Sequence, residues 1–226
     1  MLQFDVVTKE NARLVKITMD NDQVRLEAGA MYYMQGNLDL DAQMPSVGGF
    51  LKSLVTSEKA VRPVCKGTGV LYLEPSYGEF TTFDMAGEEW ILDKGAYYAS
   101  EMGVEVTAEV NKALTGFFSG EGFFQTKVRG SGKVVVHSYG PLERIDLTND
   151  KLVVDGSFVV ARSASLNFEV SKATKGVFST LISGEGLVNT LTGTGSVYIC
   201  PVQNLNSFLK NEFGGLRSLL SAKVNK

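Results

Sequence analysis

The stretch from Gly116 to Ile145 reads GFFSGEGFFQTKVRGSGKVVVHSYGPLERI, and at its centre a Gly-X-Gly doublet opens a β-branched run. The doublet is Gly130-Ser131-Gly132, and the run is Val134-Val135-Val136. The doublet recurs 63 residues earlier as Gly67-Thr68-Gly69 and 63 residues later as Gly193-Thr194-Gly195. Because each copy leads into a strand-like segment, the sequence predicts a threefold internal repeat.

A second glycine motif repeats in step with the doublets. Turns centred on Gly29, Gly95 and Gly156 lie 66 and then 61 residues apart, each between two short segments rich in aromatic or β-branched residues. Glycine at such a turn suits a positive φ or a close backbone approach. Short strands punctuated by glycine are typical of an all-β sandwich or barrel. We expect one closed β domain with approximate threefold symmetry.

The predicted domain organisation is a single β domain over residues 1–226. Residues 3–19 alternate as a hairpin around the polar turn Lys9-Glu10-Asn11. Two places have a helical pattern, the short glycine-broken segment 46–55 and a stretch after Pro201 in which Leu205, Phe208 and Leu209 share one helix face. The expected boundaries are internal repeats at about 24–86, 87–149 and 150–202, a C-terminal helix at about 203–213 and a tail over 214–226.

Composition and charge exclude several classes of protein. The 226 residues carry a net charge of −3, which gives no general attraction to phosphate backbones, so no nucleic-acid partner is expected. The start of the chain has neither a signal peptide nor a transit peptide pattern, and no apolar run reaches the ~18 residues that span a bilayer. We therefore expect a cytoplasmic protein without a transmembrane segment. Cys65 and Cys200 are expected to be buried thiols.

Three glutamates are the sharpest candidates for a shared role: Glu58, Glu121 and Glu185 occupy corresponding positions of the repeat. If a threefold axis relates the repeats, these carboxylates converge on a cation or on polar ligand groups. Alternatively, each accepts hydrogen bonds from the backbone N–H groups of its own turn. The second interpretation is favoured because a repeated turn repeats its chemistry.

His137 is the only histidine of the chain, so any Ser-His-Asp or Cys-His chemistry would need it. It follows Val136 on an apolar strand, and the chain has no Gly-X-Ser-X-Gly elbow. A cupin-type metal site needs two or three imidazoles. We therefore expect a strand-end or surface histidine, no catalytic residue, no metal site and no cofactor.

A methionine-rich and aromatic region forms the candidate interface. Residues of this kind fill cores, but they also build adhesive surfaces, and both interpretations remain open. The candidate interface residues are Met31, Tyr32, Tyr33, Met34, Phe50 and Leu51.

The threefold Gly-X-Gly strands, the turn from Gly29 to Met34 and the segment from Gly116 to Gly122 resemble an uncharacterised bacterial family. That family is related to the mitochondrial biogenesis proteins named for altered inheritance of mitochondria. The resemblance covers residues ~3–210. It implies a β-sandwich of the double-stranded β-helix kind, similar to the tryptophan RNA-binding attenuation protein, and assembly into homo-oligomers such as trimers. It transfers no catalytic residue.

Two functions follow as hypotheses. The first is a non-catalytic, oligomeric structural or scaffolding protein that works in the cytosol or at a membrane face through peripheral contact. The second is a small-ligand or nucleic-acid binding module of attenuation-protein-like fold. The second would need a basic patch assembled from scattered residues such as Lys127, Arg129 and Lys133.

Overall fold

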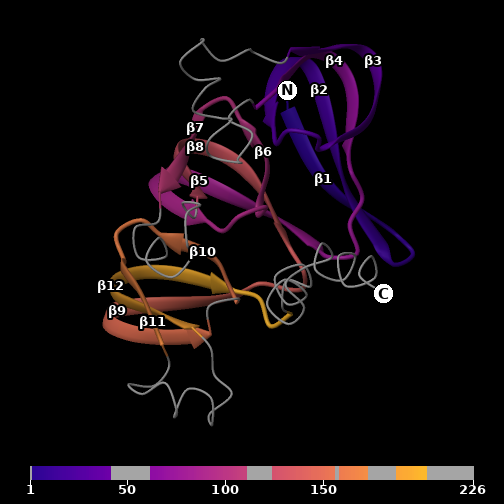
Figure 1. The fold of residues 1–226 in the computed structure, drawn as a ribbon. Coiled ribbons are helices and arrows are strands. Elements are labelled where there is room, and N and C mark those ends of the chain that lie inside the picture. Colours follow the sequence, from indigo (N-terminus) through magenta and orange to yellow (C-terminus); the bar gives the residue numbers. More distant parts are fainter. Residues whose placement is uncertain (1, 42–61, 111–123, 156–157, 173–186, 203–226) are drawn as a thin grey trace, which may run out of the picture.

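The protein is described here by a computed structural model that covers residues 2–41, 62–110, 124–155, 158–172 and 187–202 (Figure 1). These residues form twelve strands and no helix, and all the strands belong to one antiparallel sheet. An all-β fold was predicted, and it is confirmed. The strands are β1 (Leu2–Lys9), β2 (Ala12–Leu26), β3 (Met31–Asp41), β4 (Val64–Leu73), β5 (Glu79–Leu92), β6 (Tyr97–Glu101), β7 (Val104–Val110), β8 (Phe124–Ser138), β9 (Glu143–Asp155), β10 (Val159–Ser163), β11 (Asn167–Lys172) and β12 (Leu187–Ile199).

The order of strands along the sheet is β11-β12-β10-β5-β8-β6-β2-β4-β3. Off this path, β1 pairs with β2, β7 with β8 and β9 with β12. The described part of the sheet is open, because its two end strands, β11 and β3, do not pair with each other. The sequence predicted a closed β domain; the difference arises because β3 pairs only with β4 among the described strands, and β9 only with β12.

Figure 1 shows the strands in three groups that follow the chain, β1–β4, β5–β8 and β9–β12. The last strand of each group carries a Gly-X-Gly doublet and pairs with a long earlier strand: β4 with β2, β8 with β5, and β12 with β9. Two short pairings join the groups. Val24–Leu26 of β2 pairs with β6, and Trp90–Leu92 of β5 pairs with β10.

The strand after each glycine turn enters the sheet with the same irregularity. The register against the doublet strand shifts between Met31 and Tyr33 in β3, between Tyr97 and Ala99 in β6, and between Val159 and Ala161 in β10. Each is a β-bulge, in which an extra residue disrupts the pairing. The turns need glycine as predicted where the structure describes them, because φ is +85° at Gly29 and +81° at Gly95.

The core lies in three apolar clusters, each centred on one group of strands and the first two extending into the next group. In β2, Val15, Ile17 and Met19 are almost fully buried and point to one face, while the residues between them point to the other. Their cluster also holds Leu26, Cys65 and Leu71. The second cluster includes Phe83, Trp90, Leu92, Tyr97 and Val134, and the third includes Leu147, Val159, Leu166, Leu191 and Val197.

Several further predictions can be compared with the structure. The hairpin over residues 3–19 is confirmed, since β1 and β2 pair from Leu2 opposite Met19 to Lys9 opposite Ala12. Cys65 and Cys200 are buried free thiols, as expected. The two segments with a helical pattern, 46–55 and 203–213, lie outside the described residues. Within the described residues, no helix has the length and apolar character that crossing a membrane would require.

Candidate functional site

The candidate site is the outer edge of the sheet at β3, which has no strand partner on that side among the described residues. Tyr32, Tyr33 and Met34 leave 56%, 41% and 39% of their surface exposed. Neighbouring large apolar side chains on a surface mark interaction sites, and an unpaired strand edge is itself a template for pairing with another chain. We call these three residues the β3 edge surface.

Glycines of the doublet hold β3 close against β4. Gly36 of β3 lies opposite Gly69, and a Cβ on Gly36 would come within 2.8 Å of the Gly69 Cα atom. A Cβ on Gly67 would lie 2.1 Å from the carbonyl oxygen of Asn37. No other residue fits this approach, so the first Gly-X-Gly motif fixes the position of the edge strand.

Stacked rings order the β3 edge surface. The Tyr33 ring stacks on Tyr72 of β4, with centroids 4.5 Å apart and an interplanar angle of 19°. Tyr32 meets Tyr33 edge to face at 5.1 Å. Such aromatic pairs are favourable beyond the area they bury. Desolvation and the neighbouring Tyr72 raise the pKa of Tyr33, so its hydroxyl is neutral at physiological pH. The surface is therefore uncharged and partly pre-organised.

The structure divides the residues of the predicted interface. Met31 is partly buried and packs against the first core cluster, whereas Tyr32, Tyr33 and Met34 face solvent. Phe50 and Leu51 lie outside the described residues. Met31 therefore packs against the core, whereas the three residues that follow it lie at the surface.

The three candidate carboxylates Glu58, Glu121 and Glu185 also lie outside the described residues, and their convergence stays a prediction. Among the residues that the structure describes, no group of three or more His, Cys, Asp or Glu side chains is arranged to hold a metal ion.

His137 lies at the penultimate position of β8, as the sequence predicted for a strand-end histidine. Its Nε2 atom is 2.7 Å from the Ser76 hydroxyl, which accepts a hydrogen bond of 2.9 Å from the Gly78 N–H group. The imidazole packs between aromatic rings, with Phe80 at 5.3 Å and Tyr139 at 5.4 Å. Burial lowers the pKa of His137 and keeps the ring neutral at pH 7.

Ser76 is a residue that sequence reasoning missed, because no motif surrounds it and only the fold brings it to His137. A serine–histidine pair resembles the first half of a catalytic triad, but an acid must orient the second ring nitrogen for that chemistry. Burial accounts for the lowered pKa of His137, with no contribution from a neighbouring carboxylate among the described residues. The pair therefore stabilises the turn before β5, and it offers little support for Ser76 as a nucleophile.

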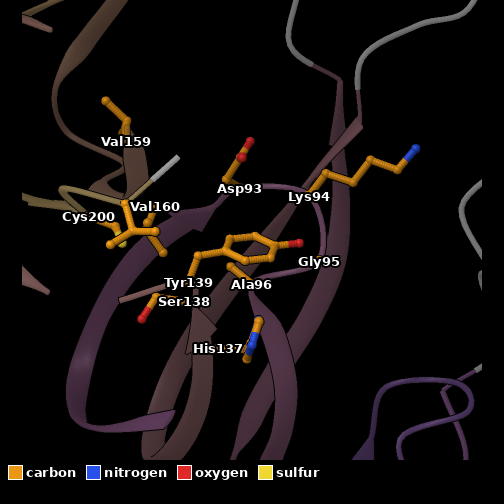
Figure 2. Close-up of a pocket in the computed structure, with 11 residues that line it drawn as sticks. Asp93, Lys94, Gly95, Ala96, His137, Ser138, Tyr139, Val159, Val160 and Cys200 are labelled. Atoms are coloured by element: carbon orange, nitrogen blue, oxygen red, sulfur yellow. The ribbon is translucent and has the colours of Figure 1, made fainter. Parts of the chain in front are cut away.

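A small hollow lies beside His137, between the turn at Gly95 and the end of β12 (Figure 2). Its volume is about 30 Å³, about a fifth of the ~150 Å³ of an engineered core cavity that binds benzene. Asp93 lies at its rim. Burial raises the pKa of the Asp93 carboxyl to about 6, although hydrogen bonds from the Lys94 N–H group and the Gln125 amide act to lower it. The hollow is too small for a metabolite.

The model of one protein family matches residues 4–202, and its description is Mitochondrial biogenesis AIM24. The chain belongs to this family.

Two relatives of this AIM24 family member come from Streptococcus pyogenes. An uncharacterised protein of serotype M6 is 26% identical over 237 residues, which cover 99% of this chain and 93% of the relative. An X-ray crystal structure of a second protein superimposes with a TM-score of 0.74 at 26% identity, over 93% of this chain and 99% of that chain. The resemblance noted from the glycine motifs is confirmed at the level of the family.

The scattered basic residues of this AIM24 family member do not form a free basic patch. The Lys127 ammonium lies 2.8 Å from Glu89. Arg129 donates a hydrogen bond of 3.0 Å to Glu105, and Lys133 pairs with Asp84. Because each of these three cations faces a carboxylate, this group of residues offers little net positive charge to a phosphate backbone.

Proposed function

We propose that this AIM24 family member is a non-catalytic structural protein that assembles into homo-oligomers through the β3 edge surface. One observation supports this most directly: Tyr32, Tyr33 and Met34 stay exposed at consecutive positions of a strand whose outer edge is unpaired among the described residues. A monomer would leave both the apolar side chains and the backbone groups of that edge to water.

The proposal includes an internal threefold repeat. The recurring bulges after each glycine turn and the pairing of each doublet strand with a long earlier strand support it. The double-stranded β-helix arrangement, the trimeric state and the cytoplasmic location stay predictions from the sequence.

Binding of a small ligand or of nucleic acid is the weaker proposal. The hollow beside His137 has a volume of only about 30 Å³, and Lys127, Arg129 and Lys133 each face a carboxylate. Peripheral contact with a membrane uses the same exposed side chains as self-association, so the two differ in what covers the β3 edge surface: lipid or protein.

Sedimentation velocity, with flotation on phosphatidylcholine vesicles, tests the proposal. The double variant Tyr32→Ser with Tyr33→Ser should shift the assembly towards monomer, while Tyr77→Ser should not. Tyr77 is a matched control, because it is the same residue type and 87% exposed, outside the β3 edge surface. A wild-type monomer at micromolar concentration would contradict the proposal, and a monomer that floats with vesicles would favour the membrane role.

A further inference from the structure

The described residues contain two examples of a contact that β3 does not make with any of them. In the first, β6 pairs with β2 so that Ala99 lies opposite Leu26 and Ser100 opposite Arg25. In the second, β10 pairs with β5 so that Ala161 lies opposite Leu92 and Arg162 opposite Ile91. The same backbone hydrogen bond begins both: Glu27 N–H donates to Tyr98 C=O, and Asp93 N–H to Val160 C=O, each at 2.8 Å.

β3 is the counterpart of β6 and β10 in the first group. All three follow a glycine turn, carry the same bulge and pair with a doublet strand, so Tyr33 corresponds to Ala99 and Ala161. The exposure differs: Ala99 is 0% and Ala161 1% exposed, whereas Tyr33 is 41% exposed. Met34 is 39% exposed, whereas its counterparts Ser100 and Arg162 are 0% and 8% exposed. A covering strand accounts for the difference.

β9 is the counterpart of β2 and β5 in the third group. Arg25, Ile91 and Val153 each lie opposite the residue that precedes the first glycine of a doublet by three positions, namely Val64, Lys127 and Thr190. Ile91, covered by β10, is 4% exposed, but Val153 is 52% exposed. On the side away from β12, β9 pairs with no strand among the described residues.

The unpaired edges of β3 and β9 are therefore the two halves of a contact that the chain makes twice within itself. Figure 1 shows them at opposite ends of the molecule, β3 in the first group and β9 in the third. Because the two edges are not self-complementary, the same contact between two copies would join them head to tail, and its repetition would give a closed ring or an open filament.

We propose that β3 of one copy adds antiparallel to the β9 edge of a second copy, with Tyr33 opposite Val154, Met34 opposite Val153 and Gln35 opposite Leu152. This rests on the proposed self-association and names the surface that receives β3. The partner is a second copy of this chain, since the chain already carries both the template and the receiving edge. Main-chain hydrogen bonds supply the affinity and the apolar side chains the register.

Disulfide capture tests the register. Tyr33 and Val154 would form a pair like Leu26 and Ala99, which lies next to a hydrogen-bonded position and so belongs to the closer type, with Cα atoms ~4.5 Å apart. That separation allows a disulfide. The full-length variants Tyr33→Cys and Val154→Cys are purified separately, mixed, incubated with oxidised glutathione and separated by non-reducing electrophoresis. The native Cys65 and Cys200 are buried and serve as an unreactive background.

The expected result is a covalent dimer that contains one copy of each variant, found in the mixture and at least tenfold weaker in either variant alone. A mixture of Tyr77→Cys with Val154→Cys measures random collision. Native mass spectrometry of the same samples separates the two proposals: an intact oligomer without the mixed dimer overturns the strand pairing and leaves self-association standing, while a wild-type monomer overturns both.

A charge-reversal pair covers the case in which the cysteine variants do not assemble. Met34→Glu and Val153→Lys should each weaken assembly at least tenfold, and the two substitutions in one chain should restore it, because every contact then brings the carboxylate opposite the ammonium. A double variant that assembles no better than the single variants overturns the pairing.

Discussion

Alanine substitutions at two corresponding glycines separate two destabilising effects of an added side chain. One is the strained backbone conformation that the residue must keep, and the other is the clash of its Cβ with a neighbouring atom. Gly130 and Gly193 open the second and third doublets, and their φ angles are +115° and +120°. Their surroundings differ. A Cβ on Gly130 would lie 2.5 Å from the carbonyl oxygen of Gly103, whereas a Cβ on Gly193 would have its nearest neighbour, a methyl group of Leu166, at 3.8 Å.

The expected loss of unfolding free energy follows from these distances. Both variants force a side chain into a backbone region that costs about 1–3 kcal/mol. Gly130→Ala must also displace a backbone oxygen, and overpacking of this kind costs a further 1–3 kcal/mol or so. We therefore expect Gly193→Ala to lose about 1–3 kcal/mol, and Gly130→Ala to exceed it by about 1–3 kcal/mol.

Urea unfolding measured by tryptophan fluorescence provides the assay. Trp90 is the only tryptophan and is 8% exposed in the second core cluster, so its emission reports loss of the core. Gly95→Ala is a control for conformation alone, because φ is +81° and no atom lies within 4 Å of the added Cβ. Protein concentration is kept constant, since assembly shifts apparent stability. Equal losses at Gly130 and Gly193 would refute the close-approach argument, and a loss below ~0.5 kcal/mol at Gly193 would refute the conformational one.

Three further predictions concern the core and two of the titratable groups whose pKa is shifted, Asp93 and His137. Asp93→Asn should stabilise the protein at pH 8 and have little effect at pH 4. The pKa of the Asp93 carboxyl is about 6 in the folded protein and ~3.9 in the unfolded chain, so the folded form loses stability as the pH rises towards 6. A gain in unfolding free energy that is larger at pH 4 than at pH 8 would contradict this. His137→Gln should reduce the loss of stability as pH falls below ~6.5, because the lowered pKa of His137 lets the unfolded chain take up the proton first; an unchanged pH profile of urea midpoints would count against it. Leu191→Ala, at a side chain with 0% exposure, should cost ~2–5 kcal/mol, whereas Val6→Ala, at 44% exposure, should change stability by ~0.5 kcal/mol at most. Similar midpoints for the last two variants would show that the third cluster is not a core.

The glycine pattern predicted the all-β fold class because the backbone conformations that require glycine are determined locally. The turns at Gly29 and Gly95 and the doublets lie where the spacing placed them, with positive φ at Gly67 and Gly130. The repeat boundaries are a different matter. The predicted limits at 86/87 and 149/150 fall inside β5 and β9.

The candidate surface was found in the sequence only in part. Alternation along a strand would place Tyr32 and Tyr33 on opposite faces, but the bulge between Met31 and Tyr33 breaks that period. The exposed run extends past the bulge, from Tyr32 to Asn37, on a strand whose outer edge is unpaired among the described residues. The sequence contains no signal for the edge of β9, because Leu152-Val153-Val154 resembles any buried strand. Only the pairing shows that one side of β9 has no strand partner among the described residues.

Hydrogen exchange at two protein concentrations, read by mass spectrometry with residue resolution, tests head-to-tail pairing most directly. Pairing predicts that the amides of Met34 and Val153 are protected at high concentration, as those of Ser100 and Arg162 are at every concentration, and that dilution to monomer removes protection from Met34 and Val153 alone. Fast exchange of both amides in an intact oligomer would contradict the pairing.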